Sequence, residues 1–198
     1  MKKLSTYLFL FLFSFSVPSF ADDISEYQIE GISIGDSLLD HLSREEIITE
    51  IESNKPTYNY LTDDFGEAYL FRKFEIYDHL SFFVKPNDKN YIIYFIKGSL
   101  VYDDNIKQCY AKQKEIVKEF SLSYKNTRKN ETTSVFPWDP TGKSNSRYVE
   151  FTFDSGDAIT VSCKEYEKSL KIKNNWKDSL SVAVSKKEVE DWLKNHIN

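Results

Sequence analysis

The first 21 residues constrain this chain most, because they decide where the folded part begins and in which compartment it folds. Lys2 and Lys3 give a positive start, and residues 7–17 (YLFLFLFSFSV) form an uncharged apolar run. Residues 18–21 (PSFA) end in the small-x-small pattern that signal peptidase cleaves. We therefore expect residues 1–21 to be a signal peptide, cleaved after Ala21, and the mature chain to be periplasmic or secreted.

A retained membrane anchor is the alternative for this segment. The stretch from residue 4 to residue 20 is short for a spanning helix, and Ser14, Ser16 and Pro18 interrupt it. No cysteine lies near the cleavage site, so we expect no lipid anchor either. Residues 22–198 are long enough to form one domain with its own hydrophobic core.

The charge of the mature chain limits the partners that it can bind. The whole chain has a formal net charge of −5, and removal of the leader, with its two lysines and no acid, lowers it to −7. Nucleic acids and anionic membranes are bound by clustered Lys and Arg residues. We therefore expect neither of them as a partner.

Cys109 and Cys163 are the only cysteines of the chain. In an oxidising compartment, an even pair of cysteines predicts a disulfide bond. The alternative is a free nucleophilic thiol, which needs an activating histidine, and none lies close in sequence to either cysteine.

The hydrophobic pattern predicts an α+β fold that begins with a pair of helices. Residues 22–34 are expected to be extended. A helical pattern follows Ser37, and a second helix is predicted to begin at once, because Ser43 and Glu46 have the spacing of a capping box.

Two βββα units are predicted after the helix pair, with antiparallel strands packed against helices. In the first unit, strands are expected at 69–76, 80–85 and 91–102, followed by a helix at 106–124. In the second unit, strands are expected at 147–154, 158–163 and 180–184, followed by a last helix that Ser185 and Glu188 would cap. The units form either one sheet or two related halves. We expect a single domain, 22–198, with sub-units 22–125 and 147–198 joined by a polar loop at 126–146. The disulfide would then join the helix of the first unit to the sheet of the second.

No motif in the chain specifies a reaction. His41, His79 and His196 have none of the spacings that zinc sites use, and the chain has no C-x-x-C pair. Carboxylates are too numerous to select a catalytic pair from sequence. We therefore expect no metal and no cofactor.

Loop 126–146 carries the residues that we predict to bind a partner. Phe136 directly precedes Pro137, and Trp138 lies between Pro137 and Pro140, in an otherwise polar stretch. Two aromatic side chains on a proline-stiffened loop can form an exposed binding surface. The alternative is that both rings pack onto the core and hold the loop in place.

Several segments resemble known sequences. The run IEGISIGDSLLDHLSREEI (29–47) is similar to the start of a family of small, uncharacterised exported proteins of marine bacteria. The later run YIIYFIKGSLVY, Cys109 and the run FDSGDAITVSC are similar to the same family, so the resemblance covers most of the mature chain. The resemblance implies export and supplies no activity. A fainter similarity is to small envelope-assembly lipoproteins, from which this chain departs because it lacks their lipid-bearing cysteine.

Together these observations favour a non-catalytic periplasmic module that binds another envelope protein or a small ligand. Two alternatives stay open. One is a small hydrolase whose histidine and carboxylate are brought together only by the fold. The other is an inhibitor of an exogenous enzyme, which would present Phe136 and Trp138 on a rigid exposed loop. The sequence leaves the oligomeric state, the strand order and the identity of the ligand open.

Overall fold

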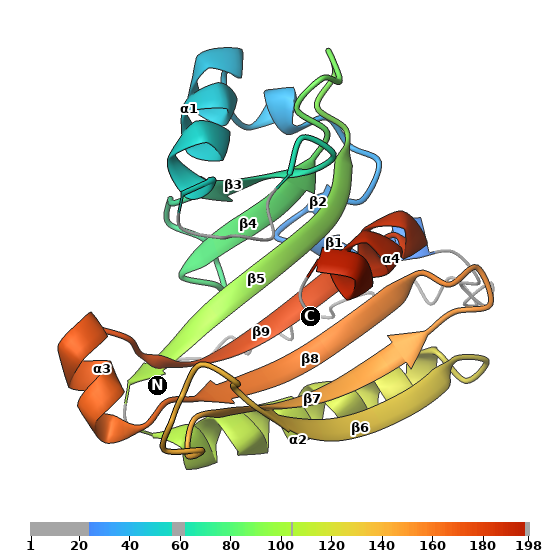
Figure 1. The fold of residues 1–198 in the computed structure, drawn as a ribbon. Coiled ribbons are helices and arrows are strands. Elements are labelled where there is room, and N and C mark those ends of the chain that lie inside the picture. Colours follow the sequence, from blue (N-terminus) through green and yellow to red (C-terminus); the bar gives the residue numbers. More distant parts are fainter. Residues whose placement is uncertain (1–23, 57–61, 104, 197–198) are drawn as a thin grey trace, which may run out of the picture.

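The computed structural model describes residues 24–56, 62–103 and 105–196 (Figure 1). The expected signal peptide, residues 1–21, lies outside the described residues. Within these ranges, no helix is both long enough and apolar enough to cross a membrane.

Seven strands form one antiparallel sheet, which confirms the α+β class and the one-sheet alternative. The strand order is β3-β4-β5-β9-β8-β7-β6, so the last strand lies between the two halves of the chain and joins them. The strands are β3 (Gly66–Leu70), β4 (His79–Val84), β5 (Ile93–Asp103), β6 (Arg128–Val135), β7 (Asn145–Thr152), β8 (Ala158–Glu165) and β9 (Asp178–Ser185).

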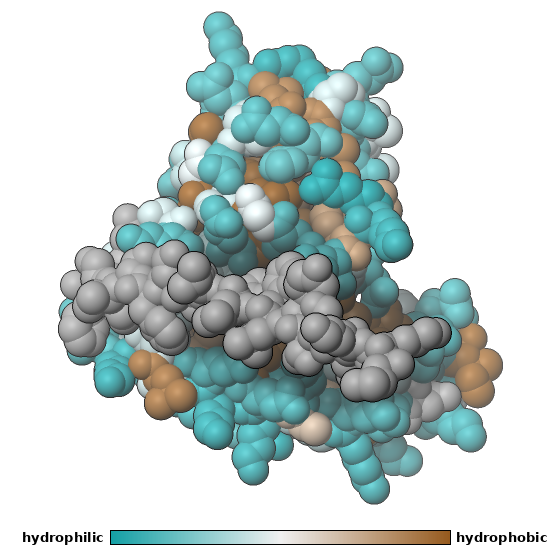
Figure 2. All heavy atoms as spheres, turned by 180° about the vertical axis from the view of Figure 1, so that it is seen from behind, coloured by the Kyte–Doolittle hydropathy of each residue, from teal (hydrophilic) through white to brown (hydrophobic). Residues whose placement is uncertain are grey.

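The main hydrophobic core lies on one face of the sheet, under helix α2 (Ile106–Ser123), and we call this side the α2 face. In Figure 1, α2 lies behind the sheet. Alternate residues of the strands point into this core, as the period of a β-strand requires. The surface seen from behind is mostly hydrophilic, with its apolar residues in small separate groups (Figure 2).

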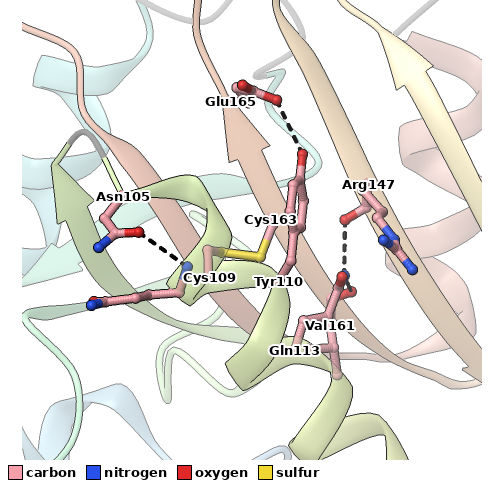
Figure 3. The surroundings of a disulfide bond; sticks show 9 residues. Asn105, Cys109, Tyr110, Gln113, Arg147, Val161, Cys163 and Glu165 are labelled. Atoms are coloured by element: carbon pink, nitrogen blue, oxygen red, sulfur yellow. Dashed lines mark hydrogen bonds between the residues drawn. A yellow bond between two sulfur atoms is a disulfide. The ribbon is translucent and has the colours of Figure 1, made fainter.

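The predicted disulfide between Cys109 and Cys163 is confirmed, and it ties α2 to β8 within this core (Figure 3). Its sequence separation of 54 residues corresponds to a stabilisation of about 4 kcal/mol in the chain-entropy treatment. One turn further along α2, the buried Gln113 donates its Nε2 hydrogens to the carbonyl groups of Arg147 and Val161, both at 2.9 Å. Covalent and polar contacts therefore hold the same helix to the second half of the sheet.

The N-terminal part departs from the predicted helix pair. It contains two 3₁₀ turns, a two-stranded sheet and one α-helix: η1 (Ile24–Glu26), β1 (Gln28–Ile29), β2 (Ile32–Ser33), η2 (Leu38–Asp40) and α1 (Arg44–Asn54). The first predicted helix is only the single turn η2. It ends early because Ser43 caps α1 almost at once, with both hydrogen bonds of the predicted capping box to Glu46 present.

The second unit is not βββα, because it contains a fourth strand and an extra short helix. Strand β6 lies inside the predicted loop 126–146. It is an edge strand that pairs only with β7, and its side chains are polar and exposed, so it lacks the hydrophobic alternation of a half-buried strand. Helix α3 (Lys168–Asn174), which buries none of its residues completely, was missed for the same reason.

Strand β3 occurs earlier than the predicted 69–76, because the chain leaves the sheet after Leu70. The carboxylate of Glu30 accepts hydrogen bonds from the backbone N–H groups of Glu75, Ile76 and Tyr77, at 2.7–3.1 Å. These donors are satisfied by a carboxylate from the N-terminal segment, so residues 75–77 do not need a partner strand.

Helix α4 (Lys187–His196) covers part of the opposite side of the sheet, which we call the α4 face; it lies in front of the sheet in Figure 1. The carboxylate of Asp157, in the β7–β8 turn, accepts from the N–H of Lys187 at 2.8 Å at the start of α4. A small aromatic core fills the contact; its fully or nearly buried members are Phe65, Phe83, Phe95, Val189 and Trp192. The rest of the α4 face is a polar surface, between α4 and α3.

Candidate binding surface

Four aromatic side chains from three separate segments meet at one end of the sheet, and we call them the aromatic patch. Phe136 and Trp138 come from the β6–β7 loop, Tyr166 follows β8, and Trp176 lies between α3 and β9. The rings of Phe136 and Trp138 stack with centroids 4.9 Å apart, and Phe136 also stacks on Tyr166 at 5.7 Å. Trp176 meets Trp138 edge-on at 5.1 Å.

The patch is open to solvent, which argues against the alternative that both rings pack onto the core. Trp138 is 50 % exposed and Trp176 is 39 % exposed, whereas Phe136 is half-buried. Neither Phe136 nor Trp138 belongs to either of the two cores. The rings are therefore packed against one another and not into the interior of the domain.

The β6–β7 loop is held rigid by a buried carboxylate. Asp139 accepts hydrogen bonds from the N–H groups of Thr141 and Ser144, at 2.8 and 2.7 Å, and from the Thr141 hydroxyl. Gly142 adopts the left-handed backbone conformation, with φ of 66°, that closes this turn. Burial would raise the pKa of the Asp139 carboxyl group, but the hydrogen bonds from Ser144 and Thr141 outweigh it and hold that pKa well below its usual value.

The other half of the patch is anchored in the same way. The hydroxyl of the buried Ser144 accepts from the N–H of Glu167, at 2.9 Å, and so links the loop to the start of α3. Asp178, which is also buried, accepts from the N–H of Tyr166 and pairs with Lys171 of α3, both at 3.0 Å. Two buried carboxylates, Asp139 and Asp178, therefore fix the positions from which the aromatic side chains extend.

The sequence pointed to half of this patch. Phe136 and Trp138 were selected because they interrupt a polar loop, whereas Tyr166 and Trp176 were missed. Two features of the sequence could have indicated Trp176. The chain has only three tryptophans, and Trp176 follows the polar Asn174-Asn175 pair. No pattern along the chain indicates that it approaches Trp138, which is 38 positions earlier.

Within the part of the chain that the structure describes, no hydrogen bond joins a histidine ring to a carboxylate. His79 is half-buried beside the rings of Tyr69 and Phe71, and burial lowers its pKa, assisted by the charge of Lys97. Among the described residues, it makes no hydrogen bond to a carboxylate. His196 bonds instead to the carbonyl group of Trp192, at 2.8 Å. In the same part of the chain, no group of three or more His, Cys, Asp and Glu side chains could hold a metal ion.

A pocket lies between α4 and the segment that precedes β3, and several of its charged groups form ion pairs, either within the pocket or with residues beside it. Lys85 contacts Glu188 at 2.6 Å, and Lys187 pairs with Asp191. The pocket wall also includes Trp192, whose Nε1 donates to the hydroxyl of Thr62 at 3.2 Å. These contacts explain the pocket residues as packing of α4.

Comparisons with known proteins add no relative: no family model, no curated protein and no solved structure matches this chain. The resemblance to exported proteins of marine bacteria therefore stays a prediction.

Proposed function

We propose that this protein is a non-catalytic interaction module of the cell envelope, and that its aromatic patch binds a partner protein. The observation that carries the proposal is the exposure of Trp138 and Trp176 on a surface whose loop is fixed by the buried Asp139. Export is part of this proposal. The disulfide between Cys109 and Cys163 supports it, because such bonds persist in oxidising compartments.

A partner protein suits this surface better than a catalytic role does. Tryptophan and tyrosine are enriched among the residues that dominate binding energy in protein interfaces. A loop that is already held in one conformation loses little entropy when it binds, so more of its contact energy is retained as affinity. The inhibitor alternative would use the same four side chains, and it differs only in the identity of the partner.

The test is site-specific photo-cross-linking in cells that produce the full chain with its leader. A photoreactive residue is placed at Trp138, and a matched control at Leu122, an exposed apolar residue of α2. We expect a discrete cross-linked product from position 138 and none from position 122. The product should disappear when Trp176→Ala is added, because the second ring of the surface is then lost. Equal products from both positions, or a product that is insensitive to Trp176→Ala, would contradict the proposal.

A further inference from the structure

We call the polar part of the α4 face, between α4 and α3, the floor. It contains a row of serines that does not belong to the aromatic patch. Ser99 of β5, Ser181 of β9 and Ser162 of β8 are directly opposite one another in register across three strands. Side chains in such a cross-strand row lie on the same face of a sheet. They are 5 %, 4 % and 9 % exposed, respectively. We call these three residues the serine row.

The hydroxyl groups of the serine row lack partners within the described residues, where none of the three makes a hydrogen bond. On the neighbouring strand β4, the Oγ atom of Ser81 is fully buried and also has no hydrogen-bond partner. Buried polar groups in proteins are almost always hydrogen-bonded, because an unpaired one loses its water without compensation. Among the described residues, only the Ser81 hydroxyl is a completely buried group of this kind, and the serine row adds three hydroxyls on the same face that are available to a polar ligand.

Two lysines flank the serine row from opposite sides. Lys97 lies two residues before Ser99 on β5, and Lys164 lies two residues after Ser162 on β8, so strand alternation puts both on the α4 face. The ammonium group of Lys97 lies 6.0 Å from the centre of the Phe95 ring, which belongs to the core under α4. The row itself continues to His79 of β4, opposite Ser99, and to Tyr148 of β7, opposite Ser162, so the two lysines lie in cross-strand rows on either side of it.

The α4 face contains carboxylates as well as lysines, because the strand register also puts Glu150 of β7 in the cross-strand row of Lys97. Lys97 has the buried Glu67 as its counter-ion, with Nζ and Oε1 3.7 Å apart. Lys164 forms no ion pair with a described residue. Burial lowers the pKa of Lys164 to about 8, and the charge of Lys97 lowers it further than Glu67 raises it.

We propose that the floor of the α4 face binds a phosphate group, held by the ammonium groups of Lys97 and Lys164 and by the hydroxyl groups of the serine row. A phosphate group has three or four acceptor oxygens and a charge close to −2, and lysine is a common ligand for it. The floor offers two of the properties that such a ligand needs, namely hydroxyl donors and a lysine, Lys164, that forms no ion pair with a described residue. The proposal does not depend on the function of the aromatic patch.

The acidic net charge of the whole chain does not prevent this floor from binding phosphate. A mature net charge of −7 would repel a phosphate at long range, but solvent screens such charges beyond about 8 Å at physiological ionic strength. The two lysines act at short range, in a half-buried setting where their field is screened less. Binding would also raise the pKa of Lys164, because the ligand would supply a counter-ion to this lysine.

The test is isothermal titration of the mature full chain with inorganic phosphate at pH 7, in a buffer without other oxyanions. Ser181→Ala and Lys164→Met should each weaken phosphate binding at least about tenfold, since each removes one group that contacts the ligand. The matched control is Lys114→Met, which removes a lysine charge from the exposed side of α2, and it should leave the affinity unchanged. A phosphate monoester titrated in parallel shows whether free phosphate or an esterified phosphate is preferred.

Stability measurements keep this test independent of folding. Ser181→Ala removes a buried hydroxyl without a partner, so the Tm of the ligand-free variant should stay the same or rise. The proposal is overturned if millimolar phosphate gives no heat with the unaltered chain. It is equally overturned if Lys114→Met weakens binding as much as Lys164→Met does. Neither result would affect the cross-linking expected at Trp138.

Discussion

Two tryptophan clusters on this protein use the same kinds of side chain in opposite ways. The cluster under α4 contains Trp192, which is 6 % exposed, and the aromatic patch contains Trp138 and Trp176, which are about half and two fifths exposed. Trp192 packs against Phe65 and Phe83, at 5.2 and 5.7 Å between ring centres, and joins a helix to the sheet. The patch rings contact mainly one another and join surface loops.

Aromatic content alone therefore does not identify a functional surface on this protein. What separates the clusters is how the backbone beneath them is held. Under α4 the rings themselves provide the contact between helix and sheet, so their burial stabilises the fold. In the patch, the backbone is already held by the carboxylates of Asp139 and Asp178, so the rings are not needed to fix it. Side chains that the fold does not need are available for binding.

The largest effect that separates the two clusters is expected for Trp192→Ala. The substitution removes a buried ring from the contact between α4 and the sheet and leaves a cavity, at a cost of about 3–5 kcal/mol in the free energy of unfolding. Guanidinium chloride unfolding at pH 7 measures this loss. A loss below about 1 kcal/mol would mean that α4 is not held by its aromatic core, and the distinction between the clusters would fail.

An intermediate effect on stability is expected at Lys164, in the floor between the two clusters, because burial there disfavours the charged form of its side chain. The pKa of Lys164 is about 8 in the folded protein and near 10.5 in an unfolded chain, so between these values the unfolded state binds more protons. Stability must therefore rise with pH above about 8, by about 1 kcal/mol between pH 7 and pH 9. It should fall again above about pH 10, since burial raises the pKa of Tyr77 to about 12.

Unfolding at several pH values in phosphate-free buffer tests this expectation. Lys164→Met removes the titrating group, so the rise between pH 8 and pH 10 should vanish in that variant. The groups whose charges act on Lys164 are Lys97, which lowers its pKa, and Glu67, which raises it. A rise that persists in Lys164→Met would assign the effect to another residue.

The smallest effect is expected for the aromatic patch. Trp138→Ala and Trp176→Ala should each lower the free energy of unfolding by less than about 1 kcal/mol, because half-exposed rings outside both cores leave no closed cavity. Thermal unfolding of the two variants and of the double variant measures this. Losses as large as that of Trp192→Ala would show that the patch is a structural core, which would remove the basis of the proposed binding surface.

The sequence alone determined the elements whose stabilising interactions are local or strongly periodic. The capping box of Ser43 and Glu46 begins α1, and the stripe that includes Cys109, Val117 and Phe120 defines α2. The disulfide followed from counting cysteines. The binding role of Phe136 and Trp138 stays a prediction. Strand β6, which lies inside the predicted loop 126–146, could not be predicted, because an exposed edge strand lacks alternating apolar residues.

Only the tertiary structure decided which distant residues meet. The placement of β9 between β5 and β8 brings Ser99, Ser181 and Ser162 into one row, and no spacing along the chain records this register. The approach of Trp176 to Trp138 and of Lys97 to Lys164 has the same origin. Helix caps and apolar stripes depend on neighbours a few residues away, whereas sheet order is set by the packing of whole strands and helices. The fold class could therefore be predicted from the sequence, while both candidate sites required the folded sheet.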